Sequence, residues 1–194
     1  MSLSIRLTGT AAALAISALS AGAVSAATID FDGAATGNQT NYTEDGFLFD
    51  EVRIVNGNCD ADSGKPCGAE NDNEVTTMTT DPTGGLFSVV SLWFQILGNG
   101  TGNDFTLTTD LGSYTFEESV WGNNNGGAYV TLADYANIFA DITFLTFATG
   151  DGGNVRFDDI VANPSVAPVP LPAAGMLLLG GLGALGMMRR RRNS

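Results

Sequence analysis

Residues 86–97 read LFSVVSLWFQIL, and nine of these twelve residues are apolar. Period-two alternation divides the apolar side chains between two faces of the segment. One face carries Leu86, Val90, Leu92, Phe94 and Ile96, and the other carries Phe87, Val89, Trp93 and Leu97. Because a strand with a single buried face alternates apolar and polar residues, this pattern predicts a β-strand inside a two-layer structure.

Shorter strand-like segments surround this stretch, and turns rich in Gly, Asn and Asp separate them. The expected strands are residues 28–31, 47–55, 74–78, 105–109, 113–121, 128–132, 138–149 and 154–161, with one helical turn at 133–137. No segment has the apolar spacing of an amphipathic helix of about three turns. This set of eight or nine short strands predicts an all-β fold, and specifically an antiparallel β-sandwich of the jelly-roll type.

The N-terminal segment, residues 1–26, has the three parts of a secretory signal peptide. Arg6 is its single charged side chain, an apolar run covers residues 11–23, and small residues lead up to Ala26. We expect cleavage between Ala26 and Ala27. An uncleaved membrane anchor is the alternative, but the apolar run is shorter than the roughly 20 residues that a membrane span needs.

The C-terminal tail, residues 169–194, combines a motif, an uncharged stretch and a basic cluster in that order. The motif is Val169, Pro170, Leu171, Pro172 and Ala173, and the cluster is Arg189, Arg190, Arg191 and Arg192. The roughly 20 uncharged residues that end at Met188 suffice to cross a bilayer. The arginines favour the cytoplasmic side, so the predicted transmembrane helix leaves the rest of the chain outside.

This order of features resembles the VPLPA variant of the PEP-CTERM sorting signal, and the resemblance covers only the tail. It implies two partners, the export machinery and an exosortase, which is a membrane cysteine peptidase that processes the tail near the proline motif. It also implies a membrane-anchored precursor that ends at the cell surface or in the extracellular matrix, where such proteins accompany polysaccharide or biofilm systems. An ordinary single-pass anchor explains the span and the arginines but gives no reason for Pro170 and Pro172.

Between the two ends, residues 27–162 have the size of one domain, and residues 163–168 form an expected Pro-containing linker. The domain holds all 21 acidic side chains but only Arg53, Lys65 and Arg156 as basic ones, a formal charge of −18. Such a charge excludes nucleic acid as a partner, and it repels anionic polysaccharide unless cations bridge the two.

The absence of histidine excludes catalytic sites of the Ser-His-Asp and Cys-His types, and it removes the imidazole ligands of zinc sites. The two cysteines, Cys59 and Cys67, lie in a loop rich in Gly, Asp, Ser and Pro at residues 56–70. In the oxidising compartment that a signal peptide implies, we expect them to form a disulfide.

Acidic residues near both ends of the domain form a candidate metal site. Alternation places Asp159 on the apolar face of the last expected strand and Asp158 on the opposite face, while Asp30 lies in the first strand and Asp32 directly follows it. A carboxylate that faces the core is costly unless it is bonded or bound to a cation. These four acids are therefore the candidate ligands of a structural calcium ion. The alternative is that they accept backbone N–H groups or solubilise the surface, in which case the chain has no cofactor.

The acidic pairs predict no catalytic residues, because neighbouring acids on a strand point to opposite faces and do not form a glycosidase dyad. Trp121 borders a polar Asn/Gly loop and is the candidate residue for stacking on a sugar ring, with packing as its alternative role. The leading function is a non-enzymatic protein of the surface or of exopolysaccharide. The alternatives are a carbohydrate-binding module with a defined ligand and, third, a glycan hydrolase.

Overall fold

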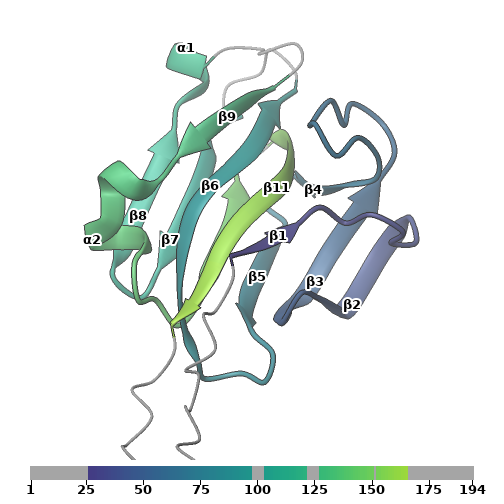
Figure 1. Ribbon diagram of the computed structural model, residues 1–194. Coiled ribbons are helices and arrows are strands. Elements are labelled where there is room, and N and C mark those ends of the chain that lie inside the picture. Colours follow the sequence, from purple (N-terminus) through teal and green to yellow (C-terminus); the bar gives the residue numbers. More distant parts are fainter. Residues whose placement is uncertain (1–25, 98–102, 122–126, 151, 166–194) are drawn as a thin grey trace, which may run out of the picture.

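The computed structural model describes residues 26–97, 103–121, 127–150 and 152–165. Their strands are β1 (Ala27–Ile29), β2 (Gly37–Glu44), β3 (Phe47–Val55), β4 (Cys67–Asn71), β5 (Val75–Thr80), β6 (Leu86–Ile96), β7 (Phe105–Thr109), β8 (Gly112–Phe116), β9 (Ala128–Thr131), β10 (Leu145–Thr149) and β11 (Asn154–Ser165). Three short helical segments, α1 (Glu118–Trp121), η1 (Ala133–Tyr135) and α2 (Ala136–Phe139), complete these ranges (Figure 1).

The expected signal peptide up to residue 25 and the expected sorting tail from Val169 to its arginine cluster lie outside the described ranges. The expected cleavage bond, between Ala26 and Ala27, lies directly at the start of β1. Within the ranges that the structure describes, no helix has the length and apolar character needed to cross a membrane. The sorting motif and the membrane helix therefore stay predictions.

All strands pair in an antiparallel manner within one curled sheet, which confirms the all-β prediction. The order along the sheet is β8-β7-β10-β5-β3-β4-β11-β6-β9, with β1 added on β11 and β2 added on β3. The curl brings the two halves of this path face to face (Figure 1). The ring of Phe147 on β10 stacks on the ring of Phe157 on β11 with centroids 4.4 Å apart, although three strands separate β10 from β11 along the sheet.

The core between these halves consists largely of phenylalanine rings, and Phe157 lies among them. Its ring also contacts Phe31 and Phe105, with centroid separations of 5.9 and 6.4 Å. Gly68 on β4 faces the same ring, and a Cβ atom there would lie 2.4 Å from its Cε2 atom. Gly68 therefore allows β4 to approach the core closely, which a side chain would prevent.

The sheet forks at β3, which means that one edge of this strand pairs with two different strands along its length. Along one edge it pairs with β2 over its whole length. Along the other edge, residues 47–49 pair with β5 and residues 53–55 pair with β4. Between these two partners, Asp50 accepts the backbone N–H of Thr77 through its Oδ1 atom at 2.8 Å. The strands β4 and β5 thus diverge from the same edge of β3.

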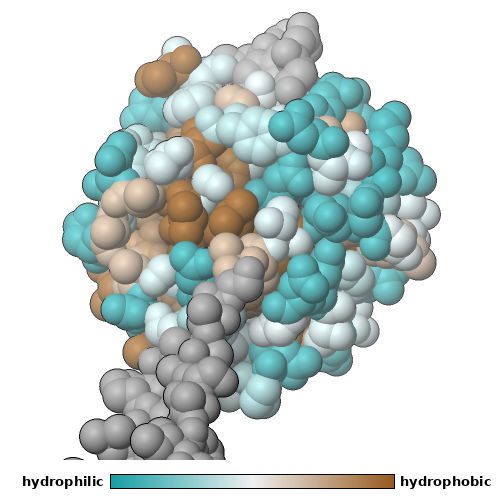
Figure 2. Space-filling view, viewed as in Figure 1, coloured by the Kyte–Doolittle hydropathy of each residue, from teal (hydrophilic) through white to brown (hydrophobic). Residues whose placement is uncertain are grey.

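The two sides of the molecule differ in polarity on the face that Figure 2 shows. Hydrophobic residues gather over β6 and β9, whereas the side formed by β2, β3 and the loop after β3 is mostly hydrophilic.

Several strand boundaries differ from the sequence-based expectation. The strands β2 and β4 were not expected, because the polar sequence GNQTNYTE and the small residues of CGAEN lack the strand pattern. The strand expected at 113–121 ends at Phe116 and is followed by α1. The strand expected at 138–149 begins only at Leu145, because its first residues belong to α2 and to a single bridge at Ile142.

The prediction of a linker at 163–168 was wrong for its first three residues, because β11 continues to Ser165. Pro164 lies opposite Phe87 in this ladder. The backbone N–H and C=O groups of Phe87 both bond to Ile142 on the other side of β6. The position opposite Phe87 therefore needs no N–H donor, and a proline fits there.

Candidate functional site

A β-bulge in β11 turns Asp159 away from the core face on which alternation placed it, whereas Asp158 stays on the predicted opposite face, under the loop after β3. The pairing of β11 with β6 shifts register after Asp158, and Asp159 has a positive φ of 45°. Asp158 is fully buried at 0% exposure, whereas Asp159 is only partly buried. Ile160, not Val161, then returns to the core. The prediction that Asp159 faces inward was wrong because the extra residue of a bulge breaks the alternation.

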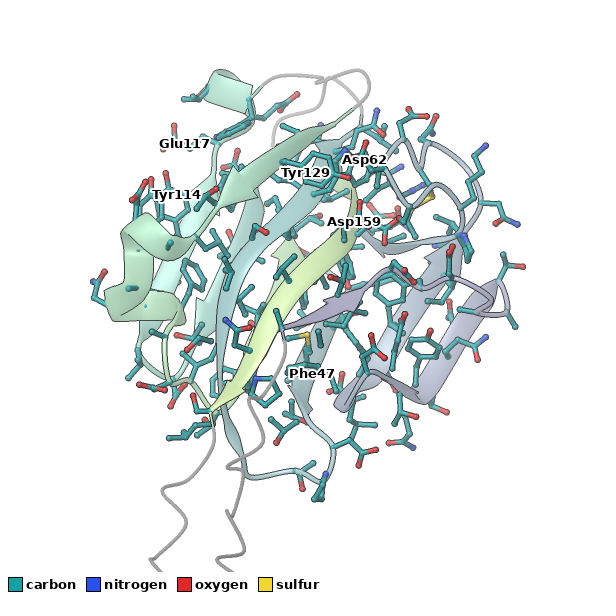
Figure 3. The ribbon with its side chains drawn as sticks, in the orientation of Figure 1. Phe47, Asp62, Tyr114, Glu117, Tyr129 and Asp159 are labelled. Carbon is teal, nitrogen blue, oxygen red and sulfur yellow. A yellow bond between two sulfur atoms is a disulfide. The ribbon has the colours of Figure 1, made fainter. Side chains whose placement is uncertain are left out.

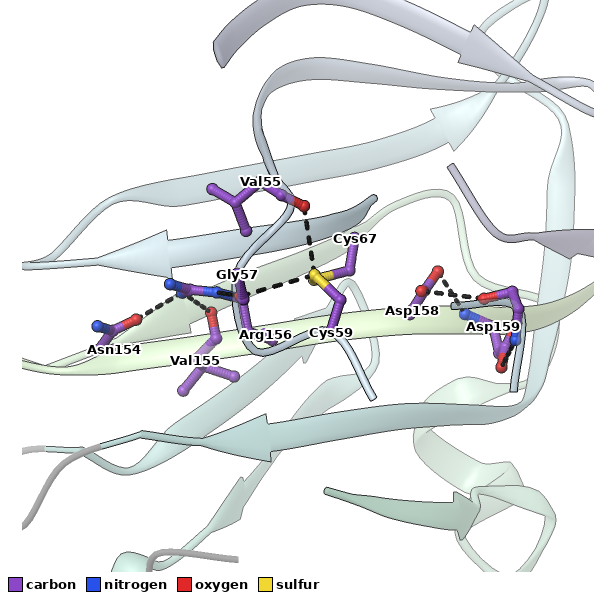
Figure 4. The surroundings of a disulfide bond; sticks show 10 residues. Val55, Gly57, Cys59, Cys67, Asn154, Val155, Arg156, Asp158 and Asp159 are labelled. Atoms are coloured by element: carbon purple, nitrogen blue, oxygen red, sulfur yellow. Dashed lines mark hydrogen bonds between the residues drawn. A yellow bond between two sulfur atoms is a disulfide. The ribbon is translucent and has the colours of Figure 1, made fainter. Parts of the chain in front are cut away.

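The predicted disulfide between Cys59 and Cys67 is present and holds the loop after β3. This loop, residues 56–66, covers the outer face at the start of β11 (Figure 4). The Nε atom of Arg156 donates to the Gly57 carbonyl at 3.2 Å. Because the loop excludes water from this face, residues on both faces of β11 are buried here.

Ser63 connects the same loop to both acids of the bulge. Its Oγ atom donates to the Asp158 carboxylate at 3.1 Å, and its backbone N–H donates to Asp159 at 3.4 Å. Burial raises the pKa of Asp158 to about 8, and the nearby charges of Asp159 and Asp30 raise it further. Hydrogen bonds from Ser63 and from the Asp159 backbone oppose this rise. Asp158 therefore carries a proton over much of the neutral range.

Tyr129 on β9 completes the contacts around the bulge (Figure 3). Its hydroxyl group donates to the Asp159 carboxylate and accepts the backbone N–H of Asp62 at 2.7 Å. Burial and the bond to Asp159 raise the Tyr129 pKa above its ordinary value. The disulfide loop, β9 and β11 are thus joined through one phenol and one carboxylate.

The four candidate calcium ligands are only partly brought together. Ile29 pairs with Ile160, which places Asp30 close to the bulge, as expected from a first strand that pairs with the last. Asp32 is exposed, and its backbone N–H donates to the Asp30 carboxylate at 2.9 Å. In the described ranges, no three His, Cys, Asp or Glu side chains are grouped as a metal site would require. Calcium binding by Asp158 and Asp159 with these partners stays a prediction.

Glu44 holds the start of the chain against β2, a role that the sequence did not reveal. Its carboxylate accepts the backbone N–H groups of Asp30 and Phe31 at 3.3 and 3.1 Å, and the hydroxyl group of Tyr42 at 2.9 Å. Burial raises the Glu44 pKa to about 7. The N–H bonds explain why Phe31, which has a positive φ, keeps its place in the core.

A hollow of about 260 Å³, called here the fork hollow, lies where β4 and β5 diverge from β3. Its lining comes from four strands and the turn before β5. The lining residues are Asn38, Gln39, Thr40, Glu51, Val52, Arg53, Ala69, Glu70, Glu74, Val75 and Thr76. This hollow was not predictable from the sequence, because it depends on the change of partner along β3.

Glu70 lies at the base of the fork hollow and is 1% exposed. Burial raises its pKa to about 8, and the charges of Glu74 and Asp50 add to the rise, while hydrogen bonds with Thr76 lower it. The Thr76 hydroxyl group in turn donates to the Glu51 carbonyl at 2.7 Å. Glu70 and Thr76 therefore connect β4, β5 and β3 at the fork.

Trp121, the candidate sugar-stacking residue, packs against the core. Its ring lies 5.2 Å from the ring of Phe94 and 5.6 Å from that of Phe116, both in edge-on geometry. These contacts favour the packing role, and its remaining exposed part leaves stacking on a sugar as a prediction. No protein-family model and no curated protein matches this chain.

Proposed function

We propose that this chain is an exported, non-enzymatic protein of the cell surface or of extracellular polysaccharide, sorted through its C-terminal tail by an exosortase. The sequence of the tail carries the proposal, because the proline motif, the uncharged stretch and the arginine cluster occur together in the order of a sorting signal. The signal peptide at residues 1–26 supplies the export that such sorting requires.

The disulfide supports export. A bond between Cys59 and Cys67 persists in oxidising compartments and is rare in the bacterial cytosol. Within the described residues both cysteines are used in this bond, so a reducing compartment would remove one of the anchors of the loop that covers Asp158.

The arrangement of the chain ends supports display at a surface. Strand β1 pairs with the end of β11, so both ends of the domain lie side by side. The disulfide loop contacts the start of β11, at the opposite end of that strand. A domain held by its C-terminal tail would therefore present the disulfide loop away from the membrane. The curled sheet supports the proposed class, a β-sandwich of the jelly-roll type.

Replacing Pro170 and Pro172 by alanine tests the proposed sorting. We expect the doubly substituted chain to stay as full-length precursor in the membrane fraction, because the processing peptidase no longer recognises its motif. Pro168→Ala, just ahead of the motif, is the matched control and should be processed normally. The same mature mass and location for wild type and the double variant would contradict the proposal.

The second candidate function is a carbohydrate-binding module, and the fork hollow is the observation that favours it. Ligand sites are concave and carry a few convergent polar groups beside apolar ones. The fork hollow combines amide, hydroxyl, carboxyl and guanidinium groups with the exposed side chain of Val75. A glycan ligand is compatible with display in extracellular polysaccharide, so the two functions do not exclude each other.

A further inference from the structure

The wall of the fork hollow is a square of four polar side chains on one face of the β2–β3 pair. Asn38 lies opposite Arg53, and Thr40 lies opposite Glu51. Residues two apart on a strand share a face, so these four side chains are neighbours. All four are exposed and line the hollow.

The next strand leaves room beside this wall. Ala69 on β4 lies opposite Arg53, and its small side chain fills little of the space. Beyond it β4 and β5 separate, so that Glu70 and Thr76 form the base. Val75, which is 52% exposed, adds an apolar surface at the rim. The hollow thus offers polar groups on one side and an apolar contact on the other.

We propose that the fork hollow binds one non-acidic pyranose unit of an extracellular polysaccharide, with its hydroxyl groups on Asn38, Thr40, Glu51 and Arg53 and its C–H groups on Val75. A pyranose has both kinds of surface, and its hydroxyl groups both donate and accept hydrogen bonds. The four wall residues supply donors and acceptors to match. The choice of a polysaccharide as the source of the sugar rests on the proposed function.

The size of the hollow limits the ligand to about one sugar ring. Pockets for drug-sized ligands have volumes of about 300–1,000 Å³, and the fork hollow, at about 260 Å³, is slightly smaller. A longer glycan therefore places one unit in the hollow and leaves the rest over the hydrophilic side of β2 and β3.

The charges around the hollow disfavour an acidic sugar. Glu51 and Glu74 line it beside Arg53, and the domain as a whole carries a large negative charge. A uronic acid would meet this negative field, which Arg53 alone does not offset. The same field attracts the ammonium group of an amino sugar, so the charges select against acidic sugars only.

The test uses the full chain in a zwitterionic detergent that contains no sugar. The probes are the methyl glycosides of glucose, galactose and mannose, with glucuronic acid and glucosamine as charged counterparts. Amide chemical shifts are followed by NMR during each titration. We expect saturable shifts with at least one neutral glycoside, concentrated at residues 38–40, 51–53 and 74–76, and weaker or no shifts with glucuronic acid.

A matched pair of variants locates the site. Thr40 and Thr43 are both exposed on β2, but only Thr40 lines the hollow. Thr40→Trp should raise the Kd for the neutral sugar at least about tenfold, because the indole ring fills the hollow. Thr43→Trp should leave this Kd within about twofold. Tryptophan suits a β-strand at either position.

Three results would overturn the proposal: no saturable shift with any neutral glycoside, equal binding by both tryptophan variants, or tighter binding of glucuronic acid than of every neutral glycoside. None of them bears on the processing of the tail, which the Pro170 and Pro172 substitutions test in cells. A failure of the hollow and a failure of the proposed sorting are therefore distinguishable.

Discussion

The hydroxyl group of Tyr129 donates a hydrogen bond to the carboxylate of Asp159, thirty residues further along the chain. The same oxygen accepts the backbone N–H of Asp62 in the disulfide loop. One side chain of β9 thus holds the bulge of β11 and the loop that covers it. The loop is anchored by this phenol, by Ser63 and by the disulfide.

Tyr129→Phe should loosen the disulfide loop without unfolding the domain. The substitution removes both hydrogen bonds of the hydroxyl group. It should lower the free energy of unfolding by about 0.5–1.5 kcal/mol for each bond lost, with the lower end expected at this exposed position. Hydrogen exchange should become faster at residues 56–66. Tyr135→Phe, which removes the bond to Tyr114 at 3.2 Å, is the control and should leave exchange in this loop unchanged. Equal protection of the loop in both variants would contradict the anchoring role of Tyr129.

The disulfide should stabilise the domain modestly, because Cys59 and Cys67 are only eight residues apart. The chain-entropy model gives about 2–3 kcal/mol for a loop of this length. Replacing both cysteines by serine should lower the free energy of unfolding, measured by urea denaturation, by this amount. Reduced wild-type protein is the control. Thiol labelling of the native, non-reduced protein should find no free cysteine. Two labelled thiols would show that the bond does not form in solution.

The domain should become more stable as the pH falls from 8 to 5. Glu70 and Asp158 have pKa values of about 8, and Glu44 has one of about 7. These pKa values exceed those of the same groups in an unfolded chain. The folded state therefore binds more protons than the unfolded state between about pH 4 and 8, and stability is lost as the pH rises through this window. Each group contributes a slope of at most about 1.4 kcal/mol per pH unit.

Glu70→Gln separates this effect from the general repulsion of the acidic surface. The amide is neutral at every pH, so the stability of this variant should depend less on pH than that of the wild type. Glu117→Gln is the matched control, because Glu117 is exposed, and it should keep the wild-type slope. Thermal unfolding from pH 5 to 8 measures both. A wild-type midpoint that rises with pH would contradict the burial of protonated acids.

Calcium should raise the melting temperature more than sodium at matched ionic strength if the acids near the bulge converge on an ion. A ligand at a hundredfold excess over its Kd stabilises the folded state by about 2.7 kcal/mol, which is several degrees for a domain of this size. Asp159→Asn should remove most of the difference. Equal effects of the two salts would show that Asp30, Asp158 and Asp159 are satisfied by protein hydrogen bonds alone.

The strands with strong apolar patterns were predictable from the sequence. Residues 47–55 and 105–109 are strands over those same bounds, and the expected strand at 86–97 ends one residue early. The disulfide followed from its loop composition. Strand β2 escaped prediction because it pairs only through β3 and is mostly exposed, so its sequence needs few apolar residues.

Other features depend on contacts between distant segments. Strand β4 has a glycine at position 68 because the backbone there lies against the Phe157 ring, and no local sequence pattern records this contact. The fork hollow exists because β3 changes partners, and the bulge at Asp159 exists in the ladder with β6. Alternation within one segment does not report such changes of register, so Asp159 was wrongly placed on the core face. The burial of Asp158 was missed because it depends on the disulfide loop that covers it.

The mass of the intact protein, isolated from the surface or extracellular fraction of the cells that make it, tests the central claim most directly. The account predicts a chain that begins at Ala27, lacks the arginine cluster of the tail and carries the Cys59–Cys67 bond as a loss of two hydrogens. A full-length chain that begins at Met1, keeps its C-terminal arginines and is recovered from the cytosol with both thiols free would contradict it.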